Sequence, residues 1–419
     1  MIWGKKGQRL AAFLPGAVFL VWMFMAMLLG GCSDKQVEEE PKKTTLELWY
    51  YWDVPNARQC LLELTNEFNR RNPETEVVLK YVPDEDFNKT LALAVADDAM
   101  PDLAIVDSAD VQYYHSMGTL KDVTDCVEEE RYLELALASC RKEGGGYVGV
   151  PLGLNCLSFY YNTDLLRQAN VQPPKTLDEF IEVARQVSSG SVYGCAFPFL
   201  QSEESIYCFL PILWAEGGSI DDIVSEESAQ AFEFIRQLAV DGSMSLSSVN
   251  MTLTDITREF ANERLAMVFA VSGSENLIRE INPDIRFEVA QIPNGDPSVT
   301  VIGGEVLTVT SQVHAEEAEA FVRFMSEPEQ MKVYLNAIGF LSSRKDVLAW
   351  QVKEDYSKQK YLTYLGNAYV RDFTPHWPSV SVVIADVINQ VILQEDPPDA
   401  LKNLAEEIRR IQEEAYEKE

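Results

Sequence analysis

Acidic and aromatic side chains follow predicted strands at points where a ligand could reach them. Asp107 and Ser108 end the apolar strand Leu103–Val106, and Trp52 and Asp53 come just after a strand that ends at Tyr50. In open α/β sheets, ligands bind at the carboxyl ends of the strands. Carboxylates there can accept hydrogen bonds from hydroxyl groups, which predicts a binding site for a polar solute. Asp53 has an alternative role as the N-cap of the helix that Pro55 opens, and Asp107 and Ser108 could likewise cap a helix.

Paired carboxylates also allow a second kind of chemistry. Asp53, Asp107 and Glu305 could converge as the acid and base of a glycosidase, whose carboxyl groups lie roughly 5–9.5 Å apart. Other enzyme signatures are absent from the sequence: Val271-Ser272-Gly273-Ser274-Glu275 is not a Gly-x-Ser-x-Gly elbow, and no phosphate-binding glycine motif occurs. We therefore predict no catalytic residue, no cofactor and no metal site.

The charge of the chain limits its partners. It has 419 residues, 35 Lys and Arg against 66 Asp and Glu, and a formal net charge of −31. Because nucleic-acid binding needs a basic surface, nucleic acid is not expected as a partner. With 47% apolar residues, the body has the composition of a globular protein that can bury sizeable cores.

Strands and helices alternate along the body, which predicts an α/β fold with open, mostly parallel sheets covered by helices on both faces. The helix after Pro55 carries an apolar stripe at Ala57, Leu61, Leu64 and Phe68. Thr176 and Glu179 have the spacing of a capping box, predicting a helix through Val187. The predicted strands are residues 46–50, 77–82, 103–106, 147–151, 157–161, 192–197, 264–271, 287–292 and 301–310, the last interrupted by Gly303 and Gly304. Two helices, 379–393 and 398–416, end the chain.

Glycine-containing extended segments at 149–155, 301–305 and 338–343 suggest that the chain crosses between two lobes. Lobe 1 is then residues 44–153 plus 304–341, and lobe 2 is residues 154–303 plus 342–419. Such crossings form a hinge, and the strand ends of both lobes would face one cleft.

The first residues have the features of an export signal. Lys5, Lys6 and Arg9 precede the apolar run Leu10–Leu29, which ends in Gly30, Gly31 and Cys32. A cysteine after two small residues resembles a bacterial lipobox, so we predict that residues 1–31 are a lipoprotein signal peptide and that Cys32 is acylated. Residues 32–44 are polar and are predicted to form a flexible tether. An uncleaved membrane helix and a plain signal peptide are the alternatives, and all three place the body outside the cytoplasm.

Six further cysteines lack the Cys-x-x-Cys spacing of zinc and redox sites. Cys126 with Cys140, and Cys195 with Cys208, could form disulfides in an oxidising compartment. Buried free thiols are the favoured alternative, because Cys60 and Cys156 fall in apolar periodic segments.

The order of several weak segments resembles the family 1 extracellular solute-binding proteins of bacterial ABC importers, which include the maltose-binding type. Each segment is weak alone, but their joint order and spacing cover nearly the whole mature chain. The segments are residues 45–53, 68–73, 100–103, 147–151, 160–165, 173–180, 260–267 and 327–330.

This resemblance implies a type II periplasmic-binding-protein fold with two α/β lobes and a multi-crossover hinge. It also implies a monomeric, lipid-anchored receptor that binds a solute between its lobes and delivers it to ABC transporter permease subunits. Relatives contact ligand through the loops that follow corresponding strands, and Asn155 takes the place of a cleft acid. The ligand-binding residues expected on this basis are Trp52, Asp53, Asp107, Ser108, Asn155, Gln201, Ser272, Ser274, Gly304 and Glu305.

The ligand expected from the resemblance is a mono- or oligosaccharide. Backbone amides of residues 272–274, before a helix, could donate hydrogen bonds to it. Relatives often carry Trp at that loop and before the Gly303-Gly304 pair, where this chain has Ile302. The missing tryptophans leave sugar phosphates, polyamines and peptides open as ligands. Trp49, Trp214 and Trp377 are expected in the core, and a sensor or adhesin that keeps the fold without transport is a further alternative.

Overall fold

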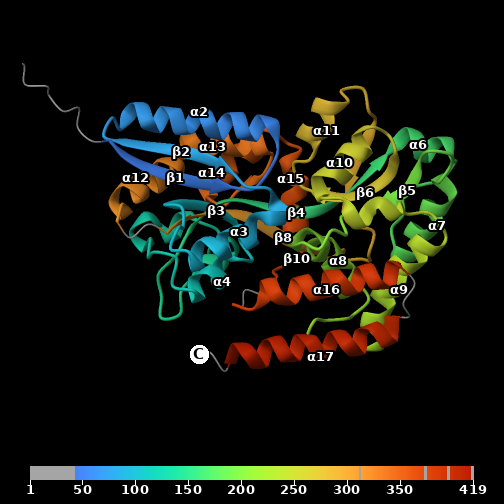
Figure 1. Ribbon diagram of the computed structural model, residues 1–419. Helices are drawn as coiled ribbons and strands as arrows, with labels where there is room; N and C mark the ends of the chain where they lie inside the picture. Colours follow the sequence, from blue (N-terminus) through green and yellow to red (C-terminus); the bar gives the residue numbers. More distant parts are fainter. Residues whose placement is uncertain (1–42, 311–312, 372–374, 394–396, 417–419) are drawn as a thin grey trace, which may run out of the picture. The chain divides into compact units, whose positions relative to one another are not determined.

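The computed structural model describes residues 43–310, 313–371, 375–393 and 397–416 (Figure 1). The predicted signal peptide, the predicted acylation site Cys32 and most of the predicted tether lie outside these residues. Within the described ranges, no helix combines the length and the apolar character that crossing a membrane requires. The body from Thr44 to the C-terminal helix is one compact unit.

The described strands form one sheet with the order β2-β1-β3-β8-β4-β6-β5, onto which β7, β9 and β10 add at β4 and β8. Their bounds are β1 Thr44–Tyr50, β2 Thr75–Tyr81, β3 Leu103–Asp107, β4 Val150–Asn162, β5 Tyr193–Ala196, β6 Leu265–Val271, β7 Phe287–Ala290, β8 Thr300–Val309, β9 Leu341–Ser342 and β10 Ala368–Tyr369. β1 pairs in parallel with β2 and β3, and β5 pairs in parallel with β6.

The expectation of a mostly parallel sheet is wrong, because β4 and β8 run against most of their neighbours. β8 is antiparallel to β3 and β4, and β4 is antiparallel to β6, β7 and β9. β4 also merges the two strands predicted at 147–151 and 157–161 into one. A burial pattern shows that a strand is covered on both faces but carries no information about its direction.

Glycines allow β4 and β8 to approach each other closely. A Cβ atom on Gly304 would lie 2.4 Å from the carbonyl oxygen of Gly153, and one on Gly303 would lie 2.6 Å from Oδ1 of Asn155. Gly303 and Gly304 therefore lie inside β8 and do not interrupt it, contrary to the sequence-based expectation.

Helices cover the sheet along its length (Figure 1). The first half of the chain contains α2 Pro55–Arg71, α3 Asp84–Ala96, α4 Val111–Ser116, α5 Glu134–Leu137, α6 Thr163–Gln168, α7 Leu177–Val187 and α8 Glu203–Ala215. The second half contains α9 Glu226–Val240, α10 Leu253–Ala261, α11 Glu275–Ile281, α12 Ala315–Met325, α13 Pro328–Ile338, α14 Lys345–Glu354, α15 Lys358–Leu365, α16 Trp377–Ile392 and α17 Pro397–Tyr416. Short 3-10 turns lie at Thr124–Cys126, Glu129–Arg131, Ala138–Cys140 and Leu246–Asn250.

Most helix predictions are confirmed at the level of residues. The stripe Ala57, Leu61, Leu64 and Phe68 is buried in α2. α7 spans the residues expected from its capping box, although only half of the box forms. The Thr176 hydroxyl accepts from the amide of Glu179 at 3.2 Å, whereas the Glu179 carboxylate accepts from the amide of Lys175 at 2.7 Å.

Two large groups of buried apolar side chains make up most of the interior. One is built from β1 to β3, α2, α12 and α13, together with part of β8. The other is built from α7 to α9, α16 and α17, together with β6 and part of β4. Trp49 lies in the first group and Trp377 in the second, as expected, and Trp214 packs against the second from a partly buried position. The exact lobe limits stay a prediction.

All six cysteines of the described body are free and buried. Burial raises the pKa of the Cys126 thiol to about 11 and that of Cys140 to about 12. The alternative of buried free thiols therefore holds for both candidate disulfide pairs.

Candidate functional site

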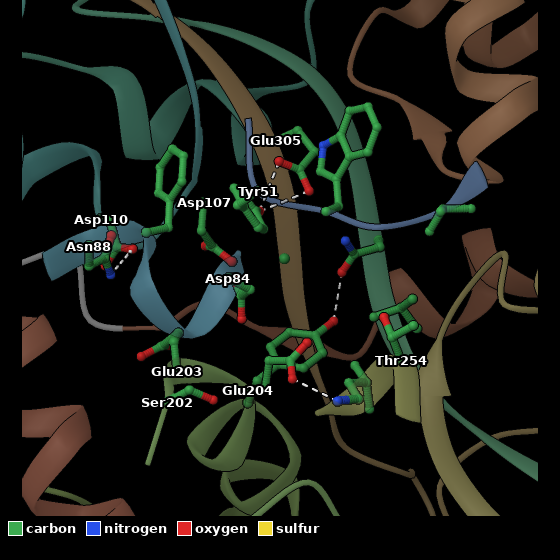
Figure 2. Close-up of a pocket in the computed structure, with 18 of the residues that line it drawn as sticks. Tyr51, Asp84, Asn88, Asp107, Asp110, Ser202, Glu203, Glu204, Thr254 and Glu305 are labelled. Carbon is green, nitrogen blue, oxygen red and sulfur yellow. Dashed lines mark hydrogen bonds between the residues drawn. The ribbon is translucent and has the colours of Figure 1, made fainter. Parts of the chain in front are cut away.

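A cavity of about 310 Å³ lies where the carboxyl ends of β1 and β3 meet α8, α10 and α16 (Figure 2). Its walls come from the loop after β1, from α3, from the end of β3, from the middle of β4 and β8, and from the start of α8. Residues of α10, α11 and α16 complete it. Elements far apart in the sequence thus place their side chains around one space.

Six of the ten predicted site residues line this cavity. They are Trp52, Asp107, Asn155, Gln201, Ser274 and Glu305. Asp107 and Glu305 are partners in the β3–β8 register, so the two carboxylates start from directly opposite backbone positions.

Asp53 is not among the residues that line the cavity. Its carboxylate makes ion pairs with Arg58 at 2.7 Å and with Arg258 at 3.5 Å, and its side chain is 40% exposed. The alternative role as an N-cap is wrong, because the N-cap of α2 is Val54 and no side chain caps this helix. Two arginines within reach hold this acid at the surface.

Ser108, Ser272 and Gly304 do not line the cavity either. The amide of Ser108 donates to the carbonyl of Gly304 at 3.0 Å, and both residues border a much smaller hollow. Ser272 is fully buried, and it exchanges hydrogen bonds with Cys156 through its amide and its hydroxyl. These residues connect strands.

The amides of residues 272–274 are already bonded within the protein, which contradicts the expectation that they donate to a ligand. The Ser272 amide donates to Cys156 at 2.8 Å, the Gly273 amide to the Glu275 carboxylate at 3.0 Å, and the Ser274 amide to Val271 at 3.1 Å. Glu275 follows this turn directly, and its carboxylate folds back to accept from the Gly273 amide, which is therefore not available to a ligand.

Arg371 is the main site residue that the sequence did not reveal. Its guanidinium is buried and donates to Asp107 at 2.5 Å and to Glu203 at 2.8 Å. It also lies over the ring of Tyr207, 5.2 Å from the ring centre. Burial alone would lower the pKa of Arg371, but the charges of Asp107 and Glu203 outweigh it and raise that pKa. The segment around Arg371 has no periodic pattern, so no sequence signal marked it.

The hydrogen-bond donor to Glu305 is a neutral hydroxyl and not a cationic side chain. Its two carboxylate oxygens both accept from the hydroxyl of Tyr51 at 2.9 Å (Figure 2). Burial, followed by the charge of Asp107, raises the pKa of Glu305 well above its usual range. Burial and the charge of Glu305 also raise the pKa of Tyr51.

Asp110 is a second buried acid on the cavity wall. Its Oδ2 accepts from the Asn88 amide at 2.7 Å, as Figure 2 shows, and Asn88 in turn accepts from Tyr114. Burial raises the pKa of Asp110 well above its usual range, and the charges of Asp107 and Glu203 add to that effect.

The amides of the site are positioned by neighbours. Asn155 Oδ1 accepts from the Tyr207 hydroxyl at 2.7 Å, and the Gln201 amide donates to Asp386 at 2.6 Å. Apolar rings also line the space, among them Trp52, Phe87 and Phe340. A cavity with aromatic faces and a few positioned polar groups can hold a small polar solute.

Comparison with known proteins gives the same fold. The model of the bacterial extracellular solute-binding protein family matches residues 63–362, more than half of the chain. A melibiose/raffinose/stachyose-binding protein of Bacillus subtilis is 20% identical over 95% of this chain and 97% of its own length.

Two solved structures superpose over 88% of this chain and all of their own. They are maltose-bound MalE3 of T. maritima, with 22% identity and a TM-score of 0.80, and a tagatose-bound ABC transporter solute-binding protein of Thermotoga lettingae, with 22% identity and a TM-score of 0.81. The expected maltose-binding-protein type of periplasmic-binding fold is therefore confirmed. By the extent of these matches, the chain belongs to the family of bacterial extracellular solute-binding proteins.

Proposed function

We propose that this protein captures a sugar outside the cytoplasm and delivers it to the permease of an ABC importer. The observation that carries the proposal is the cavity, which combines aromatic rings with carboxylates and amides from many separate elements. The names of the relatives support it, because they describe binding of maltose, tagatose and raffinose-type sugars.

The side chains of the cavity suit such a ligand. A sugar offers apolar faces to rings such as Trp52 and Phe340, and its hydroxyls can donate to Asp107 and accept from the Asn155 amide. Hydrogen bonds to charged groups contribute about 1.5–3 kcal/mol each when water is excluded.

Closure of two lobes would supply that exclusion of water. We infer that residues 44–153 with 304–341, and 154–303 with 342–419, move about the strands that join them. A ligand that touches both lobes binds the closed state more tightly and so shifts the protein toward it.

Binding without turnover fits the state of the carboxylates. Asp107 forms an ion pair with Arg371, and Glu305 accepts a hydrogen bond from the Tyr51 hydroxyl, so each carboxylate has a partner within the protein. The glycosidase alternative predicts a product, whereas the proposed receptor releases its sugar unaltered. A non-transport sensor or adhesin would bind the sugar without supporting its uptake. Growth on the bound sugar as carbon source separates the two, because deletion of the permease genes stops growth only if the protein serves transport.

Anchoring at the membrane is part of the proposal. An acylated Cys32 would hold the monomeric body at the outer face, because each buried methylene contributes about 0.8 kcal/mol. Labelling with a fatty-acid analogue tests this, since the label is lost in Cys32→Ala if the proposal is right.

A thermal-shift screen against neutral and charged sugars tests the function. A ligand at about one hundred times its dissociation constant adds about 2.7 kcal/mol of stability. The shift should shrink in Asp107→Asn and persist in Asp399→Asn, a matched loss of one charge at an 80% exposed side chain on α17. If no sugar shifts the transition, the proposal of a sugar receptor is wrong, and a chromatographically detected product would favour the glycosidase.

A further inference from the structure

Four of the described residues that line the cavity carry an amide side chain. Three of them, Asn88, Gln201 and Asn276, already donate to acceptors within the protein at 2.6–3.1 Å. The fourth is Asn155, whose Nδ2 atom donates to none of the described residues. The residue is only 6% exposed, yet this atom keeps accessible surface. Asn155 therefore has a hydrogen-bond donor left for a molecule in the cavity.

Tyr207 sets the orientation of the Asn155 amide. The Tyr207 hydroxyl donates to Oδ1 of Asn155 at 2.7 Å. Its other acceptor is the carbonyl of Val301 at 3.5 Å, beyond the usual range of about 2.5–3.0 Å for such bonds. Burial raises the pKa of Tyr207 well above its usual range, so the hydroxyl keeps the proton that it donates. Because Oδ1 is the atom that meets Tyr207, Nδ2 is the atom left for the cavity.

The ring of Tyr207 is itself held in place. Tyr207 is 5% exposed, and the guanidinium of Arg371 lies over its ring, 5.2 Å from the ring centre. Arg371 is in turn fixed by its ion pairs with Asp107 and Glu203. The hydroxyl therefore reaches Asn155 from a ring that has little freedom to move.

Gly303 leaves the space that this hydrogen bond needs. It lies opposite Asn155 in the pairing of β4 with β8. A Cβ atom on Gly303 would lie 2.6 Å from Oδ1 of Asn155 and 3.2 Å from Cε2 of Tyr207, so a larger residue would push the amide away. Gly303 is not among the described glycines with positive φ, so glycine is needed here for space and not for backbone conformation.

We propose that Tyr207 and Gly303 are positioning residues that fix Asn155 as a hydrogen-bond donor, so that the bound sugar presents an oxygen that accepts from Nδ2. This inference rests on the proposed function and specifies one contact of its ligand. The accepting atom is a hydroxyl, ether or carbonyl oxygen. A hydroxyl there keeps its own proton free for one of the carboxylates that line the same cavity.

A double-mutant cycle on sugar affinity tests the positioning role with the full-length protein in detergent. The probe is the sugar with the largest thermal shift among maltose, melibiose, raffinose, tagatose, glucose and galactose, and calorimetry gives its dissociation constant. Tyr207→Phe should weaken binding at least threefold when Asn155 is present, but less than 1.5-fold in the Asn155→Ala background. Gly303→Ala should show the same dependence on Asn155, because the amide that it displaces is absent from that background.

Asn155→Asp distinguishes a donor from an acceptor at this position. It keeps the size of the side chain and an oxygen that accepts from Tyr207, but it replaces the N–H donor with a second acceptor. We expect at least a tenfold loss of affinity. If Asn155 instead accepts from the sugar, the carboxylate is the stronger acceptor, and affinity should stay the same or rise.

Tyr160→Phe is the matched control for Tyr207→Phe. It also removes a buried hydroxyl, which donates to Glu275 at 2.8 Å, but Tyr160 is not among the described residues that line the cavity. It should leave the sugar affinity unchanged. A circular dichroism melt verifies that each variant is folded before titration.

The outcomes separate this inference from the proposed function. If none of the six sugars binds the wild-type protein, the proposed function is overturned, and the inference falls with it. If a sugar binds but Tyr207→Phe weakens it equally with and without Asn155, or no more than Tyr160→Phe does, the positioning role of Tyr207 is wrong. Affinity that is kept or raised in Asn155→Asp overturns the donor role of Asn155 and leaves the sugar receptor intact.

Discussion

Arg371 has the most consequential side chain of the site, because its removal leaves two acids without their cation. The guanidinium is buried and bonds to Asp107 and Glu203 from a segment that shows no pattern in the sequence. Asp107 could be predicted, since strand ends bind ligands in α/β sheets. Its partner could not, because a pairing between residues 264 positions apart depends on the tertiary fold.

Arg371→Met should destabilise the protein by about 3–5 kcal/mol, because breaking a buried ion pair leaves uncompensated charge. Urea unfolding followed by tryptophan fluorescence measures this change. Arg410→Met is the control, since the Arg410 side chain is 55% exposed and pairs with Glu407 and Glu414 at the surface. Exposed pairs contribute about 0–1 kcal/mol, so equal losses in both variants would contradict the role given to Arg371.

Glu305→Gln should stabilise the ligand-free protein near neutral pH. Burial and Asp107 raise the pKa of Glu305 in the folded state, so the unfolded chain loses this proton at lower pH than the native one. Stability is therefore full below the unfolded pKa of about 4.3 and falls as pH rises toward the folded pKa.

Melting temperatures across a pH series check this prediction. The gain from Glu305→Gln should be largest near neutral pH and should vanish at about pH 4, where Glu305 is protonated in both states. A gain that is constant with pH would mean that the substitution acts through packing and not through the charge of Glu305.

At the scale of elements, the sequence predicts where strands and helices lie better than how they pair. The apolar stripe of α2 follows from periodicity, and the bounds of α7 follow from the capping box predicted at its start. The antiparallel course of β4 and β8 could not be predicted, because fully buried strands look the same in either direction. The amides before α11 were assigned wrongly, because the returning side chain of Glu275 had no signal in the sequence.

The N-terminus of α10 offers a test of local stabilisation. Thr252 and Asp255 form a complete capping box, whereas Ser202 stands at the N-cap of α8 without a capping hydrogen bond. Thr252→Ala should cost about 1 kcal/mol, and Ser202→Ala should cost clearly less. Chemical denaturation of both variants measures the difference, and equal costs would show that the box adds no stability.

At the scale of the whole molecule, two polar contacts join one predicted lobe to the other. They run from the loop after β1 and the first turn of α2, in predicted lobe 1, to α10 and α11, in predicted lobe 2. Asp53 pairs with Arg258, and the Asn56 amide donates to Glu280 at 3.0 Å. Asp53 was expected to bind ligand; in the described structure it lies outside the cavity lining and makes this contact. The sequence correctly predicts that Asp53 follows a strand. It does not predict the ion pairs with Arg58 and Arg258, because these depend on the tertiary structure.

Asp53→Asn should therefore change sugar affinity by less than about fivefold, the effect of an exposed ion pair. It should also increase the radius of gyration of the ligand-free protein slightly, by weakening a contact between the predicted lobes. Small-angle scattering with and without sugar measures this. A loss of affinity as large as that of Asp107→Asn would restore Asp53 to the binding site.

The six buried thiols have a practical consequence for a protein proposed to work outside the cytoplasm. Its body should form without any oxidative step, so recombinant material made in a reducing bacterial interior should equal exported material. Dithiothreitol should leave the melting temperature unchanged. Each thiol is buried in the native state and becomes accessible only on unfolding. The rate at which Ellman's reagent modifies the thiols under mild denaturant should therefore report how often the native state unfolds.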